Sequence, residues 1–163
     1  MNKRLLTVIV IILAVGAAWL GYRYFHPDEP ARIGRALDKF CETIGRAQGE
    51  SPATMAVKML SLERQLCPSI DVKMNILPIQ GRFSVEELVS HAGRLRPLCE
   101  TLTVAATSRE ITLEAPTEAT VDCTIVAYAT WGGEPHRDAI NCQIFLQKID
   151  GNWKFAAFRD ALQ

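Results

Sequence analysis

An uncharged apolar run from Leu5 to Leu20 constrains this chain most, because it directly follows the basic residues Lys3 and Arg4. The run holds ten Leu, Ile and Val residues, and each favours membrane insertion by roughly 0.3 to 0.6 kcal/mol. Sixteen helical residues span about 24 Å, less than a hydrocarbon core of about 30 Å, so the helix must continue to Phe25. The sequence predicts a transmembrane helix over 5–25, which anchors the protein in a membrane behind a short basic N-terminus at residues 1–4.

The same segment also has the layout of a cleaved secretory signal, because the small residues Gly16, Ala17 and Ala18 follow the basic and apolar parts. Trp19 and Leu20 continue the apolar run past these small residues, which favours an uncleaved, single-pass signal-anchor. In both cases the positive charges keep the amino end in the cytoplasm. We therefore expect the remaining domain on the extracytoplasmic, periplasmic side of a bacterial membrane.

Residues 27–163 suffice for one domain with a single hydrophobic core. The chain has 18 basic and 18 acidic residues and a formal net charge of zero. Its basic residues are scattered, so no stripe of positive charge is available to bind a phosphate backbone. We expect no nucleic-acid partner.

Three segments in the first half of the domain have apolar residues at helical spacing. The first covers about 28–49. The second covers 51–68, with Ser51 as its N-cap before a proline. The third covers 84–99 and begins with an S-x-x-E capping box at Ser84. These signals predict three helices.

The remaining segments have the two-residue alternation of half-buried strands. One strand is expected between the second and third helices, and the others follow the third helix, with a bulge or tight turn near Ser108. Gly132 to Pro135 and the Asp150–Gly151 pair are turn signals. The expected fold class is therefore α+β, with three N-terminal helices on one face of a long, curved antiparallel sheet. The expected strands cover residues 70–76, 102–115, 119–131, 140–146 and 153–157.

This order of elements, which ends in KIDGNWKFAAFRDA from Lys148 to Ala161, resembles the nuclear transport factor 2-like superfamily of cystatin-like cones. The resemblance covers Pro27 to Gln163. It implies that the helices and the concave sheet face enclose a cavity, which members use for isomerisation, cyclisation, dehydration, ligand binding or protein docking. The fold does not select among these functions.

Enzymes of this fold need a carboxylate or an imidazole inside the cone as a general base. Because the core-facing residues of the strand 119–131 are all apolar, we assign no catalytic residue. Asp71, His91 and Arg109 are the candidates for a polar group that enters the cavity from elsewhere. The expected cavity wall is apolar and consists of Met55, Met59, Val121, Ile125, Ile144 and Phe155.

Metal and cofactor sites have no support in the sequence. The three histidines are far apart, and no phosphate-binding loop or nucleophile elbow is present. The cysteines, Cys41, Cys67, Cys99, Cys123 and Cys142, lack the C-x-x-C spacing of a zinc or redox site. They are expected as small buried hydrophobes, with a disulfide between Cys123 and Cys142, on consecutive strands, left open.

Two functions from different classes fit these observations. The first is a membrane-tethered, non-enzymatic module that docks a protein partner through its cone-shaped domain or scaffolds an assembly, since tethering raises the effective concentration of a weak binder. Its layout resembles an inner-membrane assembly component of bacterial type IV secretion systems and the mitochondrial import-motor anchor family. The alternative is a small enzyme, similar to an isomerase, cyclase or dehydratase, or an apolar-ligand-binding protein. A homodimer through the outer sheet face, with Thr120, Thr124 and Tyr128, is also expected.

Overall fold

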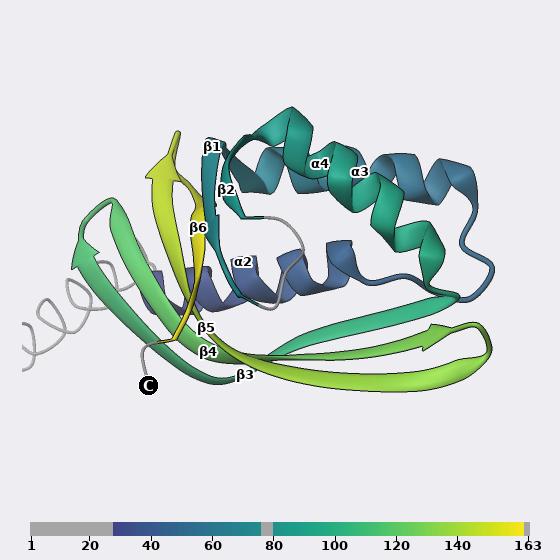
Figure 1. The fold of residues 1–163 in the computed structure, drawn as a ribbon. Coiled ribbons are helices and arrows are strands. Elements are labelled where there is room, and N and C mark those ends of the chain that lie inside the picture. The colour runs from purple at the N-terminus through teal and green to yellow at the C-terminus, as the bar shows by residue number, and fades with distance from the viewer. Residues whose placement is uncertain (1–27, 76–79, 162–163) are drawn as a thin grey trace, which may run out of the picture.

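The computed structural model describes residues 28–75 and 80–161, which form a cone of helices and strands (Figure 1). The predicted membrane anchor at residues 5–25 lies outside these described residues. Among the described residues, no helix is both long and apolar enough to cross a membrane. The elements are α2 (Glu29–Ile44), α3 (Pro52–Gln65), β1 (Leu66–Lys73), β2 (Gly81–Ser84), α4 (Val85–Leu95), the short 3₁₀ helix η1 (Arg96–Leu98), β3 (Thr101–Ala115), β4 (Glu118–Trp131), β5 (Glu134–Ile149) and β6 (Asn152–Asp160).

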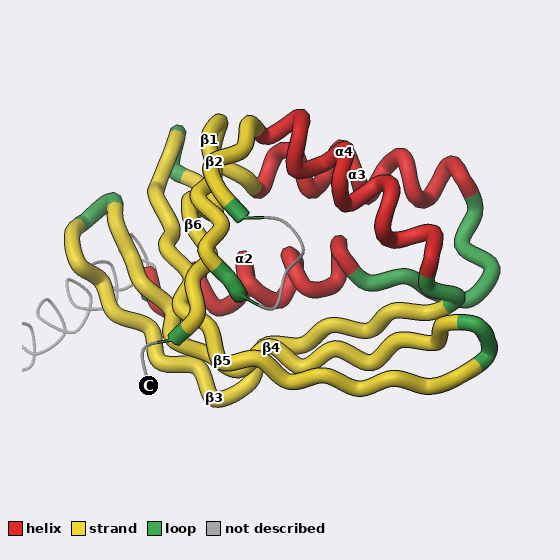
Figure 2. The backbone as a smooth tube through the Cα atoms, in the orientation of Figure 1, coloured by secondary structure: helices red, strands yellow, loops and turns green. Residues whose placement is uncertain are grey.

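The predicted α+β architecture of three helices against a curved sheet is confirmed (Figures 1 and 2). The six strands are ordered β2-β1-β6-β5-β4-β3. The prediction of an entirely antiparallel sheet is wrong at one pair, because β1 runs parallel to β6. The short edge strand β2, which pairs with β1, was not predicted.

The second helix ends earlier than its apolar spacing predicts. It stops at Gln65, and Leu66 already pairs with Phe155 of β6. Leu66 is fully buried, so pairing with β6 outweighs the local helical periodicity, as tertiary contacts commonly do.

A bulge bends the long strand β3 near Ser108, as predicted. Ser108 has a φ of +49°, and the register between β3 and β4 shifts between Thr107 and Glu110. Arg109 follows the bulge, donates to the carbonyl oxygen of Ala106 at 2.8 Å and pairs with Asp38 of α2. The bulge therefore curves the sheet and also ties it to a helix.

Two tight hairpins connect the last three strands at the predicted turns. Gly132 and Gly133 join β4 to β5 with φ of +60° and +80°, while Asp150 and Gly151 join β5 to β6 with φ of +50° and +75°. Positive φ at both central residues is the backbone of a type I′ turn, which matches the right-handed twist of the strands.

The core lies between the helices and the concave face of the sheet. Phe40 of α2 stacks on Phe155 and Phe158 of β6, with ring centroids 4.3 and 5.6 Å apart. Phe155 is completely buried, and such aromatic pairs contribute about 1 kcal/mol beyond the area they bury. These contacts attach α2 to β6, next to the parallel pair.

The capping box of α4 is present with both of its reciprocal hydrogen bonds, between Ser84 and Glu87. Changing Ser84 to Ala removes the side-chain acceptor for the Glu87 amide and should lower the free energy of unfolding by about 1 kcal/mol. Urea unfolding of the full chain measures this loss. The control is Ser90→Ala in the exposed part of the same helix, which should change stability by less than about 0.5 kcal/mol; equal effects of the two changes would contradict the capping role.

Candidate functional site

An apolar cavity of about 430 Å³ lies inside the cone, between the helices and the sheet. The surface that its residues turn toward the cavity is entirely apolar. The volume is within the usual range for small-molecule sites, roughly 300 to 1,000 Å³. The wall consists of Phe40, Cys41, Ile44, Leu62, Leu66, Val72, Met74, Leu88, His91, Ala92, Leu95, Arg96, Cys99, Leu102, Val104, Ile125, Ala127, Ile140, Cys142, Ile144 and Phe158.

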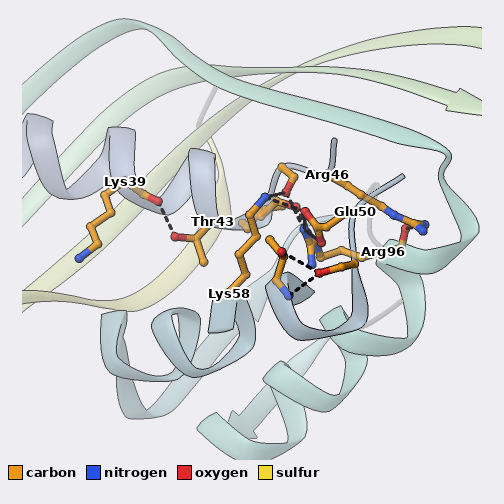
Figure 3. Close-up of polar contacts among 10 residues, drawn as sticks. Lys39, Thr43, Arg46, Glu50, Lys58 and Arg96 are labelled. Atoms are coloured by element: carbon orange, nitrogen blue, oxygen red, sulfur yellow. Dashed lines mark hydrogen bonds and ion pairs between the residues drawn. The ribbon is translucent and has the colours of Figure 1, made fainter. Parts of the chain in front are cut away.

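A buried ion pair joins Glu50 to Arg96, which is part of the cavity wall (Figure 3). Each side chain is only 3% exposed, and Nη2 of Arg96 lies 2.9 Å from Oε1 of Glu50. Arg96 also donates to the carbonyl oxygens of Ile44 and Gly45, at 2.8 and 2.6 Å. Because Arg96 begins η1, its guanidinium fastens the end of α2 to the segment that follows α4.

Two further cations join this network from neighbouring elements (Figure 3). Lys58 of α3 donates to Oε2 of Glu50 at 2.8 Å and to the carbonyl oxygen of Gly45 at 2.7 Å. Arg46 donates to the carbonyl oxygen of Arg96, and its backbone pairs with that of Leu102 at the start of β3. We call Arg46, Glu50, Lys58 and Arg96 the closing cluster. It joins α2, α3, η1 and β3.

The Glu50 carboxyl group stays ionised in this buried position. Burial alone would raise its pKa, but the hydrogen bond from Lys58 and the charges of Arg96 and Lys58 together hold the pKa below its usual value. One atom of the cluster is unpaired among the described residues, since Nη1 of Arg96 is buried without a hydrogen-bond partner.

Asp71, the first candidate polar residue, lies outside the cavity. The alternation of β1 buries Val72 in the cavity wall and turns Asp71 to the opposite face. There its carboxylate lies 3.0 Å from Nζ of Lys73 and 3.5 Å from Nη2 of Arg159. The hydrogen bond from Lys73 is the main reason that the pKa of Asp71 is lowered. A carboxylate held in its charged form by two cations is a weak proton acceptor.

His91 and Arg109, the other two candidates, occupy different places. His91 of α4 is part of the cavity wall, where its ring packs edge-on against Phe83 with centroids 5.8 Å apart. Arg109 is the bulge residue that pairs with Asp38, and it does not line the cavity. The structure therefore does not bring the three candidates together.

The residues expected in the cavity wall divide into two groups. Ile125 and Ile144 lie in the wall, whereas Val121 and Phe155 are completely buried in the core and do not line the cavity. Met55 and Met59 also lie away from the wall, on α3 beside Gly93 of α4. Much of one side of the wall is instead supplied by α4, through Leu88, Ala92 and Leu95.

A second, wider hollow of about 890 Å³ lies outside the cone, between α2, α3 and the β5–β6 hairpin. Five cationic residues line it, namely Arg32, Arg35, Lys39, Arg64 and Lys154. Exposed aliphatic side chains from α3, Val57 and Leu60, stand beside them. We regard the inner cavity as the candidate site, because its accessible wall is entirely apolar and is formed by the helices and the sheet together.

The closing cluster predicts a specific acid sensitivity. Because the folded-state pKa of Glu50 is lowered, its stabilising contribution is complete above the unfolded pKa of about 4.3 and is lost as pH falls through the folded value. Changing Glu50 to Gln should lower the free energy of unfolding by about 3 kcal/mol at pH 7, since buried Arg96 and half-buried Lys58 lose their counter-charge.

Urea unfolding of the full chain between pH 7 and pH 3 measures this effect. The difference between wild type and Glu50→Gln should stay constant near neutral pH and shrink in the acid range. Exposed Glu63 on α3 provides the matched control, and Glu63→Gln should change stability by less than about 0.5 kcal/mol. A difference that does not depend on pH would exclude an ionised, paired Glu50.

The comparisons with known proteins show the fold. No family model matches the chain, and no curated protein matches it by sequence. A putative scytalone dehydratase from Novosphingobium aromaticivorans is similar in structure, with a TM-score of 0.60 and 17% identity, over 82% of this chain and 85% of that one.

A putative dehydratase of the nuclear transport factor 2-like family from Streptomyces avermitilis has a TM-score of 0.65 at 12% identity, over 84% of this chain and 100% of that one. A hexachlorocyclohexane dehydrochlorinase has a TM-score of 0.63 at 13% identity, over 82% of this chain and 84% of that one. The domain thus has the nuclear transport factor 2-like fold expected from the sequence.

Proposed function

We propose that this domain binds an apolar small molecule in the cavity of its cone. The observation that carries the proposal is the cavity of about 430 Å³ with an entirely apolar accessible wall. Burial of apolar ligand surface in such a space contributes about 25 cal/mol per Å². A polar or charged ligand would lose its hydration there without new partners. The chemistry of the wall therefore favours a neutral, hydrocarbon-rich compound.

The wall offers little for proton transfer. Among the described residues that form it, none is Asp or Glu, and His91 is the one imidazole. The similar structures include two putative dehydratases and a dehydrochlorinase, all named for elimination reactions, which need a base. If the bound compound is also converted, His91 is the residue that could act as the base. Its ring would have to turn a nitrogen toward the cavity, because the surface that faces the cavity is apolar.

Membrane tethering and protein docking remain predictions. The predicted anchor at residues 5–25 lies outside the part of the chain that the structure describes, and the docking partner has no specific support from the geometry. An apolar ligand is compatible with a tethered domain, because the adjacent bilayer is a reservoir of apolar compounds.

A substitution that fills the cavity should abolish ligand binding. Ala127 of β4 lies in the wall, and Ala127→Phe places a ring in the space. Ala139 of β5 is exposed and does not line the cavity, so Ala139→Phe is the matched control. Native mass spectrometry of the full chain, extracted gently from its membrane, should show a retained small molecule in wild type and Ala139→Phe only.

Repeating the extraction with a second detergent tests whether the retained mass is a biological ligand. A mass that stays the same in both detergents supports the proposal. The proposal would be contradicted if the retained mass changed with the detergent, or if Ala127→Phe retained the compound as well as wild type does.

Conversion of the retained compound can be tested with a second pair of histidine variants. His91→Asn should keep the compound bound but stop its conversion, because the wall then lacks a base. His136→Asn, in the exposed start of β5, is the control and should behave as wild type. Product formation is followed by liquid chromatography and mass spectrometry, and unchanged conversion by His91→Asn would exclude the catalytic role.

A further inference from the structure

Two cysteines lie directly opposite each other on neighbouring antiparallel strands. Cys123 of β4 and Cys142 of β5 are register partners, and their sulfur atoms are 3.8 Å apart. Their exposed fractions are 6% and 1%. Opposed residues in an antiparallel pair have Cα atoms about 4.5 to 5.5 Å apart, inside the range of about 4.4 to 6.8 Å that a disulfide spans. Side-chain rotation with a slight approach of the strands brings the two sulfur atoms to bonding distance.

The other cysteines lack such a partner among the described residues. Cys41 lies on α2, and burial raises the pKa of its thiol to about 11. The sulfur of Cys67 on β1 is 3.8 Å from the backbone oxygen of Lys154, and Cys99 is half-buried after η1. Among the five cysteines, only Cys123 and Cys142 are therefore paired as register partners on neighbouring strands.

We propose that Cys123 and Cys142 are an oxidative modification site, at which a cross-strand disulfide forms while the domain matures in an oxidising compartment. The oxidant is an exchangeable disulfide, either a small one such as oxidised glutathione or that of a thiol oxidoreductase. One of the two cysteine sulfurs attacks the oxidant as its thiolate and releases the oxidant's first thiol. The sulfur of the other cysteine then attacks the mixed disulfide and releases the second.

This exchange is balanced in atoms and electrons. The two protein thiols lose two electrons and two protons, and the oxidant takes up both to become two thiols. Two protein S–H bonds and the oxidant's S–S bond are broken, and one protein S–S bond is formed.

The folded domain covers both members of the pair. The two sulfur atoms lie within hydrogen-bonding distance of each other, and both side chains are almost completely buried. Because both thiols are covered in the folded domain, the reaction belongs to the stage before the helices cover the sheet.

The disulfide would have two structural consequences. It would close the segment 123–142, which contains the β4–β5 hairpin, and would therefore stabilise the fold by restricting the unfolded chain. It would also lie beside the candidate site, because Cys142 forms part of the cavity wall. The proposal concerns the maturation of the domain and does not depend on ligand binding.

The test uses the full chain, extracted from its membrane in a denaturing buffer that contains an alkylating agent, so that the thiols are trapped as they exist in the cell. Peptide mass spectrometry should find Cys123 linked to Cys142, with the other cysteines alkylated. Reduction before alkylation should label all five. Recovery of both thiols in alkylated form without reduction would overturn the proposal.

Unfolding in urea gives a second readout. The trapped-disulfide protein should unfold at a higher urea concentration than the reduced protein, and Cys99→Ser, which leaves the pair intact, should keep this difference. Cys142→Ser should remove it. If Cys142→Ser does not fold, wild type and Cys99→Ser are each compared with and without reductant. An identical midpoint of urea unfolding in both redox states would overturn the proposal.

Discussion

The buried ion pair between Glu50 and Arg96 is the interaction on which the rest of the cone depends. It lies where two helices, the 3₁₀ turn and the start of β3 meet, and its hydrogen bonds satisfy the backbone carbonyls at the end of α2. Removing two charges from water costs several kcal/mol per ion. Such a pair offsets this cost only when its geometry is good and its hydrogen bonds are made. Here it joins the layers beside a cavity whose accessible wall is apolar.

The local elements of this fold were predictable because their signals are local. The capping box at Ser84, the bulge near Ser108 and the two hairpin turns depend on residues a few positions apart, and each is where the sequence predicts it. The parallel pairing of β1 with β6 was not predictable in this way. It joins Leu66 to Phe155, and alternation in a sequence does not state which strand will be the neighbour.

The apolar character of the candidate site was predictable from the sequence, but only some of the residues that line it were. The apolar strand positions indicated an apolar cavity, and Ile125 and Ile144 do line one. The sequence did not predict the closing cluster. Arg96, the partner of Glu50, is 46 positions away in the chain. In addition, a charged residue next to a helix N-cap is usually exposed to solvent. The same limitation applies to Asp71, whose cation partner Arg159 is contributed by the last strand.

The parallel pairing of β1 with β6 also determines when the cavity can form during translation. β1 acquires its parallel neighbour only after β6 has left the ribosome, since the pairing joins residues 66–73 to 155–159. Closing a loop of that length makes the contact late and slow. Until then the nascent chain exposes the apolar residues that will form the cavity wall, which makes it vulnerable to aggregation. The pairing of β6 therefore determines when the earlier helices and strands can form the cavity.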